Sequence, residues 1–379
     1  MKITLIGPSK LFISGISIYT IRLANALSKK NQISVVCLRK LLPRILFPGK
    51  KRIGENISNF EFSKGIRIFD GVNYASPLSW IGALRFIERI NPDVVIFQWW
   101  SSSVLHTYIL IRFFLKVKTK IVVEMHEVID PVESRTFIVR LYSKIFGRFF
   151  LKNLDGYITH SEHDKKLVSE TYDIDEKRIK VIPHGLYDQY KKIDRKIAKS
   201  SLNIEEEFVI LYFGLIRRYK GVFHLIDAFE ILPKEILEKS RLVLVGEIWD
   251  EEKKLKKRID SSNLRDRITL VDRYVYDREL ENFFSCADVV VLPYLRASQS
   301  GVAHIAMAYG KPVVVSKVGG LGEALEIYEG TFFVNPEVPV DIAEKITKVY
   351  KTSKSYESPQ EYRWEKVSRK YLEFLEDDF

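Results

Sequence analysis

Short apolar runs alternate with amphipathic stretches along the whole chain, and this alternation limits the possible folds more than any other feature. In the first half, the apolar runs lie at residues 3–6, 33–38, 94–97, 120–123 and 156–159. Helical patterns lie between them, at residues 16–29, 78–89, 137–151 and 162–172. Runs without polar alternation are typical of strands buried on both faces. Because these strands alternate with helices, we predict an α/β fold with a parallel, helix-covered sheet.

The second half repeats the same rhythm. Its apolar runs lie at residues 209–213, 241–245, 268–270, 289–292, 312–316 and 331–334, and its helical patterns at 221–232, 250–261, 277–285, 302–309 and 340–353. The 379 residues also exceed the roughly 250–300 that a single core holds. We therefore predict two Rossmann-like domains, residues 1–190 and 191–355, and a last helical segment within 356–379. Open α/β sheets bind ligands outside the carboxyl ends of their strands, so a cleft between two facing sheets is expected.

Positive charge is concentrated in the first half. Residues 1–190 hold 29 lysines and arginines against 17 acids, whereas the remainder holds 31 against 32. A basic half suggests an anionic partner such as nucleic acid, anionic lipid or a phosphorylated substrate; drift in surface composition is the alternative. Neither a Gly-x-Gly-x-x-Gly nor a Walker A sequence occurs, which argues against nicotinamide and P-loop nucleotide binding.

The sequence gives no sign of export or of a membrane span. The first apolar run is too short for a signal peptide, and no small-x-small cleavage site follows it. The longest apolar stretch, residues 104–115, falls short of the roughly 18 residues that a span requires. Two cysteines fit a reducing compartment. We expect a cytoplasmic protein that is peripheral on the inner membrane leaflet.

A series of segments in the second half occurs in a recognisable order. They read FGLIRRYKG at 213–221, LVLVGE at 242–247, VDRYV at 271–275, CADVVVLPY at 286–294, SQSGV at 298–302, AMAYGKPVV at 306–314 and GGLGE at 319–323. This order resembles the retaining glycosyltransferases of family 4, the glycosyl transferases group 1. The first half agrees, with HE at 126–127, DGYITHSE at 155–162 and VIPHG at 181–185. The resemblance implies the GT-B fold: two facing Rossmann-like domains, a central cleft and a C-terminal helix crossing back to the first domain.

The resemblance also implies an activity, the transfer of a sugar from a nucleoside-diphosphate sugar to an acceptor with retention of anomeric configuration. Fixed cations stabilise the negative charge of the leaving diphosphate. Lys220 aligns with the family's lysine, while the position of the family's arginine is Leu215, so that Arg217 must substitute from two residues further on. Solvated loop charges are the alternative. His126 resembles the histidine near the transferred sugar, and we predict His126, Arg217 and Lys220 as the catalytic set.

Further donor contacts follow from the same resemblance. Gly301 and Val302 are expected to begin a helix whose N–H groups bind an anion. The hydroxyl of Ser300 is expected to contact the same anion, and its alternative role is that of an ordinary N-cap. Tyr274 and Val275 resemble the nucleobase segment, with a core tyrosine as the competing interpretation. The last predicted donor residues are Gly15, in the loop after the first strand, and Glu323, whose alternative role is that of an acid near a helix N-terminus.

One departure from the family pattern stands out. The family usually has a pair of glutamates for the donor sugar and the ribose, but the second aligns with Ile305 and the first falls near Ala297 or Ser298. A catalytically silent GT-B subunit, or a sugar-nucleotide epimerase, therefore stays open beside the transferase. We predict no metal and no cofactor beyond the sugar nucleotide, since Asp173-Ile174-Asp175 lies in a predicted turn.

Residues 134–152 combine five cations with aromatic side chains and contain no acid. Arg140, Lys144, Arg148 and Lys152 recur every four residues, and a second basic cluster spans residues 39–52. Such segments bind anionic membranes. We expect the first domain to dock there and to reach a glycan or lipid-linked acceptor for polysaccharide or glycolipid assembly. The alternative is a helix packed on its own sheet with a solvated charged face. Nucleic acid is not expected, because no recognised binding module accompanies the charge.

Overall fold

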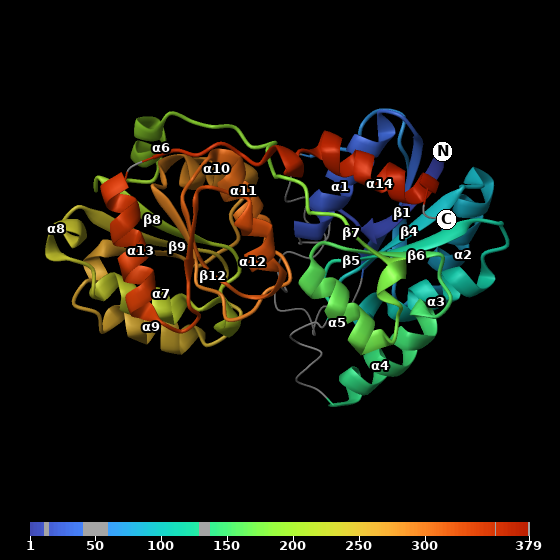
Figure 1. Ribbon diagram of the computed structural model, residues 1–379, viewed down its shortest axis with the longest axis horizontal. Helices are drawn as coiled ribbons and strands as arrows, with labels where there is room; N and C mark the ends of the chain where they lie inside the picture. Colours follow the sequence, from blue (N-terminus) through green and yellow to red (C-terminus); the bar gives the residue numbers. More distant parts are fainter. Residues whose placement is uncertain (11–14, 41–59, 129–136, 353, 378–379) are drawn as a thin grey trace. The chain divides into compact units, whose positions relative to one another are not determined.

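The computed structural model describes residues 1–10, 15–40, 60–128, 137–352 and 354–377 (Figure 1). The chain forms two compact units. The first unit comprises residues 1–185 together with 361–379, and the second comprises residues 186–360. The first unit is thus built from both ends of the chain.

The first unit is centred on a seven-stranded parallel sheet. Its strands are β1 (Lys2–Pro8), β2 (Gln32–Lys40), β3 (Arg67–Asn73), β4 (Val94–Trp99), β5 (Lys120–Met125), β6 (Gly156–Thr159) and β7 (Ile179–Val181). They lie in the order β3-β2-β1-β4-β5-β6-β7, and every pair is parallel. The apolar-run pattern did not predict β3, because this edge strand is polar and half-exposed along most of its length.

Helices cover both faces of this sheet (Figure 1). They are α1 (Gly15–Ser28), α2 (Pro77–Ile90), α3 (Leu105–Phe114), α4 (Phe137–Leu151), α5 (Glu162–Tyr172) and α14 (Trp364–Asp377). Successive residues of one strand point to opposite faces. Val122 accordingly packs in the core beneath α1 and α14, while Val123 packs in the core beneath α2 to α5.

The C-terminal helix α14 belongs to the first unit, as predicted. Its residues Val367 and Tyr371 are fully buried in the same core as α1. The indole of Trp364 lies directly over Gly185, where any Cβ would collide with the ring. The chain therefore leaves the first unit at a glycine that its own C-terminal helix covers.

The second unit has the same architecture with six strands. These are β8 (Phe208–Phe213), β9 (Ser240–Val245), β10 (Ile268–Val271), β11 (Val289–Leu292), β12 (Val313–Ser316) and β13 (Thr331–Val334). Its helices are α6 (Arg195–Ser201), α7 (Val222–Glu230), α8 (Lys234–Leu237), α9 (Glu252–Asp260), α10 (Asp277–Cys286), α11 (Gly301–Tyr309), α12 (Gly319–Glu326) and α13 (Pro339–Thr352). All strands are parallel, in the order β10-β9-β8-β11-β12-β13.

Both sheets reverse their strand order once, and this places the functional loops. The reversal lies between β1 and β4 in the first unit and between β8 and β11 in the second. Doubly wound sheets bind ligands at such a switch point, beyond the carboxyl ends of the strands. The two Rossmann-like halves confirm the predicted fold class. Among the helices that the structure describes, none has the length and apolar character needed to cross a bilayer.

Candidate functional site

The switch point of the second unit joins the loop after β8 to the segment after β11. Gly221 ends the first loop in a left-handed conformation, with φ +69°. A Cβ at this position would collide with the carbonyl oxygen of Pro293. The backbone of the two segments can therefore meet only because residue 221 is glycine.

Lys220 lies at the centre of this junction. Its Nζ is 3.5 Å from the centroid of the Tyr294 ring and 5.3 Å from that of Tyr219. A cation over an aromatic face is stabilised by the ring quadrupole. Tyr294 is buried, which raises the pKa of its phenol, and its hydroxyl is 3.4 Å from Ser300 Oγ. Tyr294 therefore links Lys220 to the residue that precedes α11.

Gly301 and Val302 begin α11, as predicted. Ser300 precedes them with an extended backbone, φ −143°, and its side chain does not cap the helix. Val302 packs toward the loop after β8, since its Cγ2 is 3.4 Å from where a Cβ of Gly214 would lie. The N–H groups at the start of α11 and the macrodipole of this nine-residue helix form a site suited to an anion.

Arg217 lies in the same loop but in a different environment. Its guanidinium is 5.1 Å from the ring centroid of Trp249 and 5.6 Å from that of Tyr219. Its Nε makes no hydrogen bond within the part of the chain that the structure describes, and it is 3.9 Å from Asp250 Oδ2. A phosphate that bound Arg217 would therefore compete with Asp250.

The other donor residues are on separate elements of the second unit. Val275 is buried and Tyr274 half-buried, both between β10 and α10. Glu323 is half-buried within α12, beyond the first turn of that helix. Gln299 Nε2 donates to the carbonyl oxygen of Gly320 at 3.4 Å, which ties the loop before α11 to the start of α12.

The positions where the resemblance implies glutamates carry other side chains. Ile305 is buried in α11 and Ser298 is buried in the loop before it. Ala297 is half-buried. The helix α11 contains no acidic residue.

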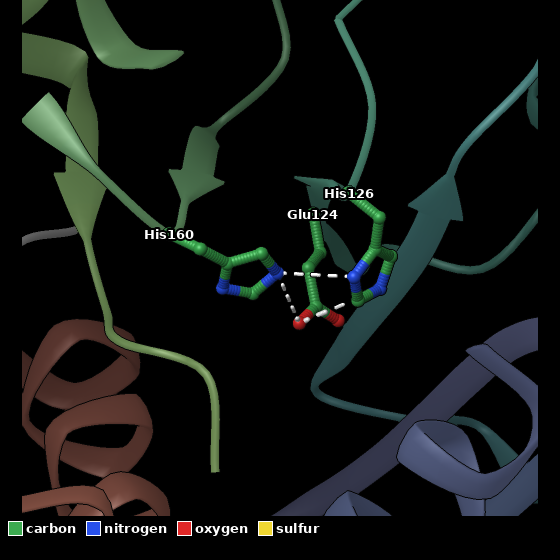
Figure 2. A group of neighbouring side chains, drawn as sticks. All are labelled: Glu124, His126 and His160. Atoms are coloured by element: carbon green, nitrogen blue, oxygen red, sulfur yellow. Dashed lines mark hydrogen bonds and ion pairs between the residues drawn. The ribbon is translucent and has the colours of Figure 1, made fainter. Parts of the chain in front are cut away.

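The first unit brings three histidines to one edge of its sheet. His126, His160 and His184 follow the adjacent parallel strands β5, β6 and β7, and all three are buried. Carboxyl ends of parallel strands meet at one edge, so the rings gather around Tyr19 of α1, at 4.5 to 5.5 Å between centroids. Figure 2 shows two of these histidines around Glu124, which lies near the end of β5.

The hydrogen bonds assign the tautomers of this pair. His160 Nδ1 is 2.9 Å from the carbonyl oxygen of Ile182, which can only accept, so Nδ1 carries the proton. In the neutral ring, His160 Nε2 then accepts from His126 Nδ1 at 3.0 Å. This leaves a lone pair on His126 Nε2, which has no hydrogen-bond partner among the described residues and is 3.8 Å from Glu124 Oε1. Burial, and secondly His160, lower the pKa of His126 well below its ordinary value, so the ring is neutral at pH 7.

Glu124 is held by donors from two other elements. Gln98 of β4 donates to its Oε2 at 3.0 Å, and Tyr371 of α14 donates to its Oε1. The hydroxyl of Tyr19 is 2.8 Å from that of Tyr371. Burial, and secondly the carboxylate, raise the pKa of both tyrosines, so both remain donors.

Among the described residues, Glu124, His126 and His160 form a group whose side chains are of the kinds that ligate a metal ion. Their ligand atoms lie within 4.8 Å of one another, and two imidazoles with a carboxylate suit Zn²⁺. The same atoms already bond to each other and to Gln98 and Tyr371. The absence of a catalytic metal stays a prediction. The Asp173–Asp175 segment is a turn, as expected, since Asp173 ends α5 and Asp175 caps a 3-10 turn.

Sequence reasoning did not select His160, Gln98 or Tyr371. A histidine just after each of three consecutive apolar strands was the available signal for the first. Gln98 and Tyr371 gave none, because Gln98 lies within a buried strand and Tyr371 within an apolar stripe of a helix.

The remaining predicted positions lie at the surface of the first unit. Gly15 begins α1 and is exposed. The exposed cations of α4 and its C-terminal end are Arg140, Lys144, Arg148 and Lys152. Of the second basic cluster, only residues 39 and 40 lie within the described residues.

Two family models match consecutive parts of the chain. "Glycosyltransferase Family 4" matches residues 13–189, and "Glycosyl transferases group 1" matches residues 194–366. Together with the two Rossmann-like units, these matches define the class, and the chain belongs to the glycosyltransferases of GT-B fold. More particularly, its first unit carries the family 4 domain and its second unit the group 1 domain.

Several curated proteins are similar over part of the chain. Mannosylfructose-phosphate synthase of Agrobacterium fabrum is 28% identical over 54% of this chain and 47% of its own length. An uncharacterized glycosyltransferase of Methanocaldococcus jannaschii is 28% identical over 78% of each chain. A lipopolysaccharide 1,2-N-acetylglucosaminetransferase of Salmonella typhimurium is 26% identical over 53% of this chain and 57% of its own. The chain thus spans about half the length of two of these relatives.

Among solved structures, Anabaena HepE in complex with UDP and glucose superposes with a TM-score of 0.70. The identity is 16%, and the match covers 100% of both chains. At this identity the likeness establishes the fold.

Proposed function

We propose that this chain transfers a hexosyl group from a nucleoside-diphosphate sugar to a glycan or lipid-linked acceptor, with retention of anomeric configuration. The observation that carries the proposal is the position of Lys220, held over Tyr294 beside the N-terminus of α11 at the switch point of the second sheet. The Anabaena neighbour with UDP and glucose supports a nucleotide-sugar donor. The lipopolysaccharide relative supports a role in cell-surface polysaccharide or glycolipid assembly, which we propose takes place at the cytoplasmic face of the membrane.

Charge complementarity explains how this junction would act. Cleavage of the bond between the sugar and its phosphate leaves the electron pair on the terminal phosphate, which adds one negative charge to the two already on the diphosphate, and preorganised donors stabilise this charge in the transition state. Lys220 supplies a point charge, and the N–H groups of Gly301 and Val302 supply the helix terminus. Arg217 would join them by exchanging Asp250 for a phosphate oxygen.

The remaining donor contacts are assigned by resemblance. Tyr274 and Val275 would bind the nucleobase, Glu323 the donor and Gly15 a phosphate or the acceptor. Because α11 has no acid, the sugar and ribose hydroxyls would be recognised by hydroxyl and backbone groups.

His126 is the proposed contribution of the first unit to the reacting centre. Its neutral ring carries a lone pair on Nε2, which is buried 3.8 Å from Glu124 Oε1; a sugar hydroxyl that reached this atom would donate a hydrogen bond to it. We assign no protein nucleophile. The leaving phosphate is proposed to take the proton of the acceptor hydroxyl on the same face of the sugar.

A panel of nucleoside-diphosphate sugars tests the proposal directly. Thermal shift reports binding, and release of free sugar reports slow hydrolysis of the donor. Stabilisation by one diphosphate identifies the base, and hydrolysis establishes catalysis. Stabilisation without turnover in the presence of acceptors would favour a silent binding subunit, whereas isomerised sugar nucleotide would favour an epimerase.

Lys220→Ala tests the diphosphate site. We expect the affinity for the matching nucleoside diphosphate to fall roughly 10- to 100-fold, because a charge-assisted contact is lost. Calorimetric titration measures the change, and Lys257→Ala, an exposed lysine on α9, is the matched control. Unchanged affinity for Lys220→Ala would refute the proposed contact.

A further inference from the structure

The described side chains of helix α4 form two apolar faces, and one of them packs in the core of the first unit. Gly147 and Phe150 are buried, with the Phe150 ring 5.4 Å from Phe97 and 5.9 Å from Trp99 between centroids. Gly147 lies against Tyr172, whose Cε1 is 3.1 Å from where a Cβ would be. This face satisfies the core of the first unit.

The second apolar face is exposed to solvent. Its side chains recur every four residues along one stripe of the helix: Phe137, Leu141, Ile145 and Phe149. Phe137 is 67% exposed and Phe149 is 58% exposed. Exposed large side chains at this spacing form a continuous stripe.

The neighbouring helix α3 extends this surface. Its last residues, Phe113 and Phe114, are 74% and 53% exposed, and α3 packs beside α4 (Figure 1). A recess of about 400 Å³ lies between the two helices, lined on its apolar side by Ile109, Phe113 and Phe149. We call these exposed side chains of α3 and α4, with the recess, the α3–α4 face.

Cations border this face on the helix surface. Arg140, Lys144, Arg148 and Lys152 each lie three residues after a member of the apolar stripe, and all are exposed. Arg148 donates to the carbonyl oxygen of Thr171, and Arg140 lies 5.7 Å from the Phe137 ring centroid. Neither α3 nor α4 contains an acidic residue, so no charge of the helices themselves opposes an anionic surface.

We propose that the α3–α4 face inserts into the surface of an anionic lipid bilayer. Aromatic and aliphatic side chains beside lysine and arginine match the boundary between acyl chains and negatively charged headgroups. The recess accepts part of an acyl chain, and Lys152 at its rim faces the headgroup phosphates. This inference rests on the proposed function in one respect: it places the acceptor among membrane-bound lipids.

Flotation with vesicles tests this face without any donor sugar. The full-length chain should bind vesicles of phosphatidylcholine with 30 mol% phosphatidylglycerol, and more weakly at 0.5 M NaCl, because salt screens the charges. Lys144→Glu with Lys152→Glu should lower partitioning more than about tenfold, since each basic residue near such a surface contributes a roughly fivefold change. Phe113→Ser with Phe149→Ser should lower it at least as much.

Two control variants carry the same kinds of substitution at exposed positions outside the α3–α4 face. Leu78→Ser with Ile327→Ser removes exposed apolar side chains, and Lys253→Glu with Lys257→Glu reverses two exposed charges on α9. Both controls should bind vesicles like the unaltered chain. Circular dichroism and thermal unfolding establish that each variant is folded.

Three results would overturn the proposal. They are absence of binding to anionic vesicles, equal binding to phosphatidylcholine alone, and a dimer in solution that the Phe113 and Phe149 changes dissociate. Donor-induced thermal shift, measured on the same variants, separates this inference from the proposed function. If a variant no longer floats with the vesicles but still binds the donor, the transferase proposal stands. If the chain floats but no donor shifts its thermal unfolding, only the transferase proposal is refuted.

Discussion

At the scale of single residues, His126 owes its protonation state to groups far away in the chain. Its ring is buried, and His160 holds its Nδ1 proton by a hydrogen bond that Ile182 in turn orients. Burial penalises the charged form, and a second imidazole nearby adds to this penalty. Near pH 7, His126 is therefore uncharged, and its Nε2 is a hydrogen-bond acceptor.

This state makes folding stability depend on pH in a defined direction. Above the ordinary histidine pKa of 6.5, His126 is neutral in both the folded and unfolded chain and adds no pH dependence. Below 6.5 only the unfolded chain binds the proton, so stability falls as the pH drops toward the lowered pKa. We expect His126→Gln to weaken this loss, measured by urea unfolding between pH 7.5 and 5. An identical pH dependence in the variant would contradict the assignment.

At the scale of elements, α14 completes the polar network around Glu124 and the two histidines beside it. Tyr371 crosses from this helix to Glu124, whose other described donor is Gln98 of β4. A buried carboxylate is tolerated only when donors surround it. The C-terminal helix therefore does more than cover an apolar face, because it supplies one of the donors on which Glu124 depends.

Tyr371→Phe should destabilise the first unit by about 1–3 kcal/mol, because it leaves the buried carboxylate with one donor fewer. Glu124→Gln combined with Tyr371→Phe should cost less than the sum of the two single changes. Denaturant unfolding of the four proteins measures this coupling. Strict additivity would show that the two side chains do not interact.

At the scale of the whole molecule, each unit repeats one arrangement with different chemistry at its strand ends. The second unit presents a cation and a helix terminus, whereas the first presents histidines and a carboxylate. The excess positive charge lies in the first half, away from the proposed diphosphate residues of the second. The exposed cations of α4 account for part of this charge and agree with an anionic acceptor surface.

We expect sugar transfer to proceed without a bound metal, because Lys220 and the N-terminus of α11 provide the positive potential that a metal would supply. Purified protein should contain less than stoichiometric zinc by mass spectrometry of metals. Its activity should be unchanged after dialysis against a chelator. Loss of activity that zinc restores would instead assign Glu124, His126 and His160 as ligands.

Much of the fold could be predicted, because a strand buried on both faces must be apolar throughout and so leaves a visible run. The pattern missed the two edge strands β3 and β7, since an edge strand needs only partial burial. It also missed the helices α3, α6, α8 and α12, of which α6 and α8 are short and α12 begins with glycines. Lys220, Gly301 and Val302 could be selected because they follow strand ends in a recognisable order. Tyr371 could not, because an apolar helix stripe with a tyrosine is equally consistent with an ordinary core.

The sequence by itself determined the two parallel sheets, the loops at their carboxyl ends and the basic stripe of α4. These depend on local periodicity and spacing, which folding preserves. Only the tertiary structure decided that Glu124 is covered by Tyr371, that His160 sets the tautomer of His126, and that α4 keeps a second apolar face exposed. Those properties depend on contacts between residues that are 34 to 247 positions apart in the chain or on which surfaces stay uncovered. Hydrophobic burial is non-directional, so a local sequence pattern does not specify which surfaces will meet.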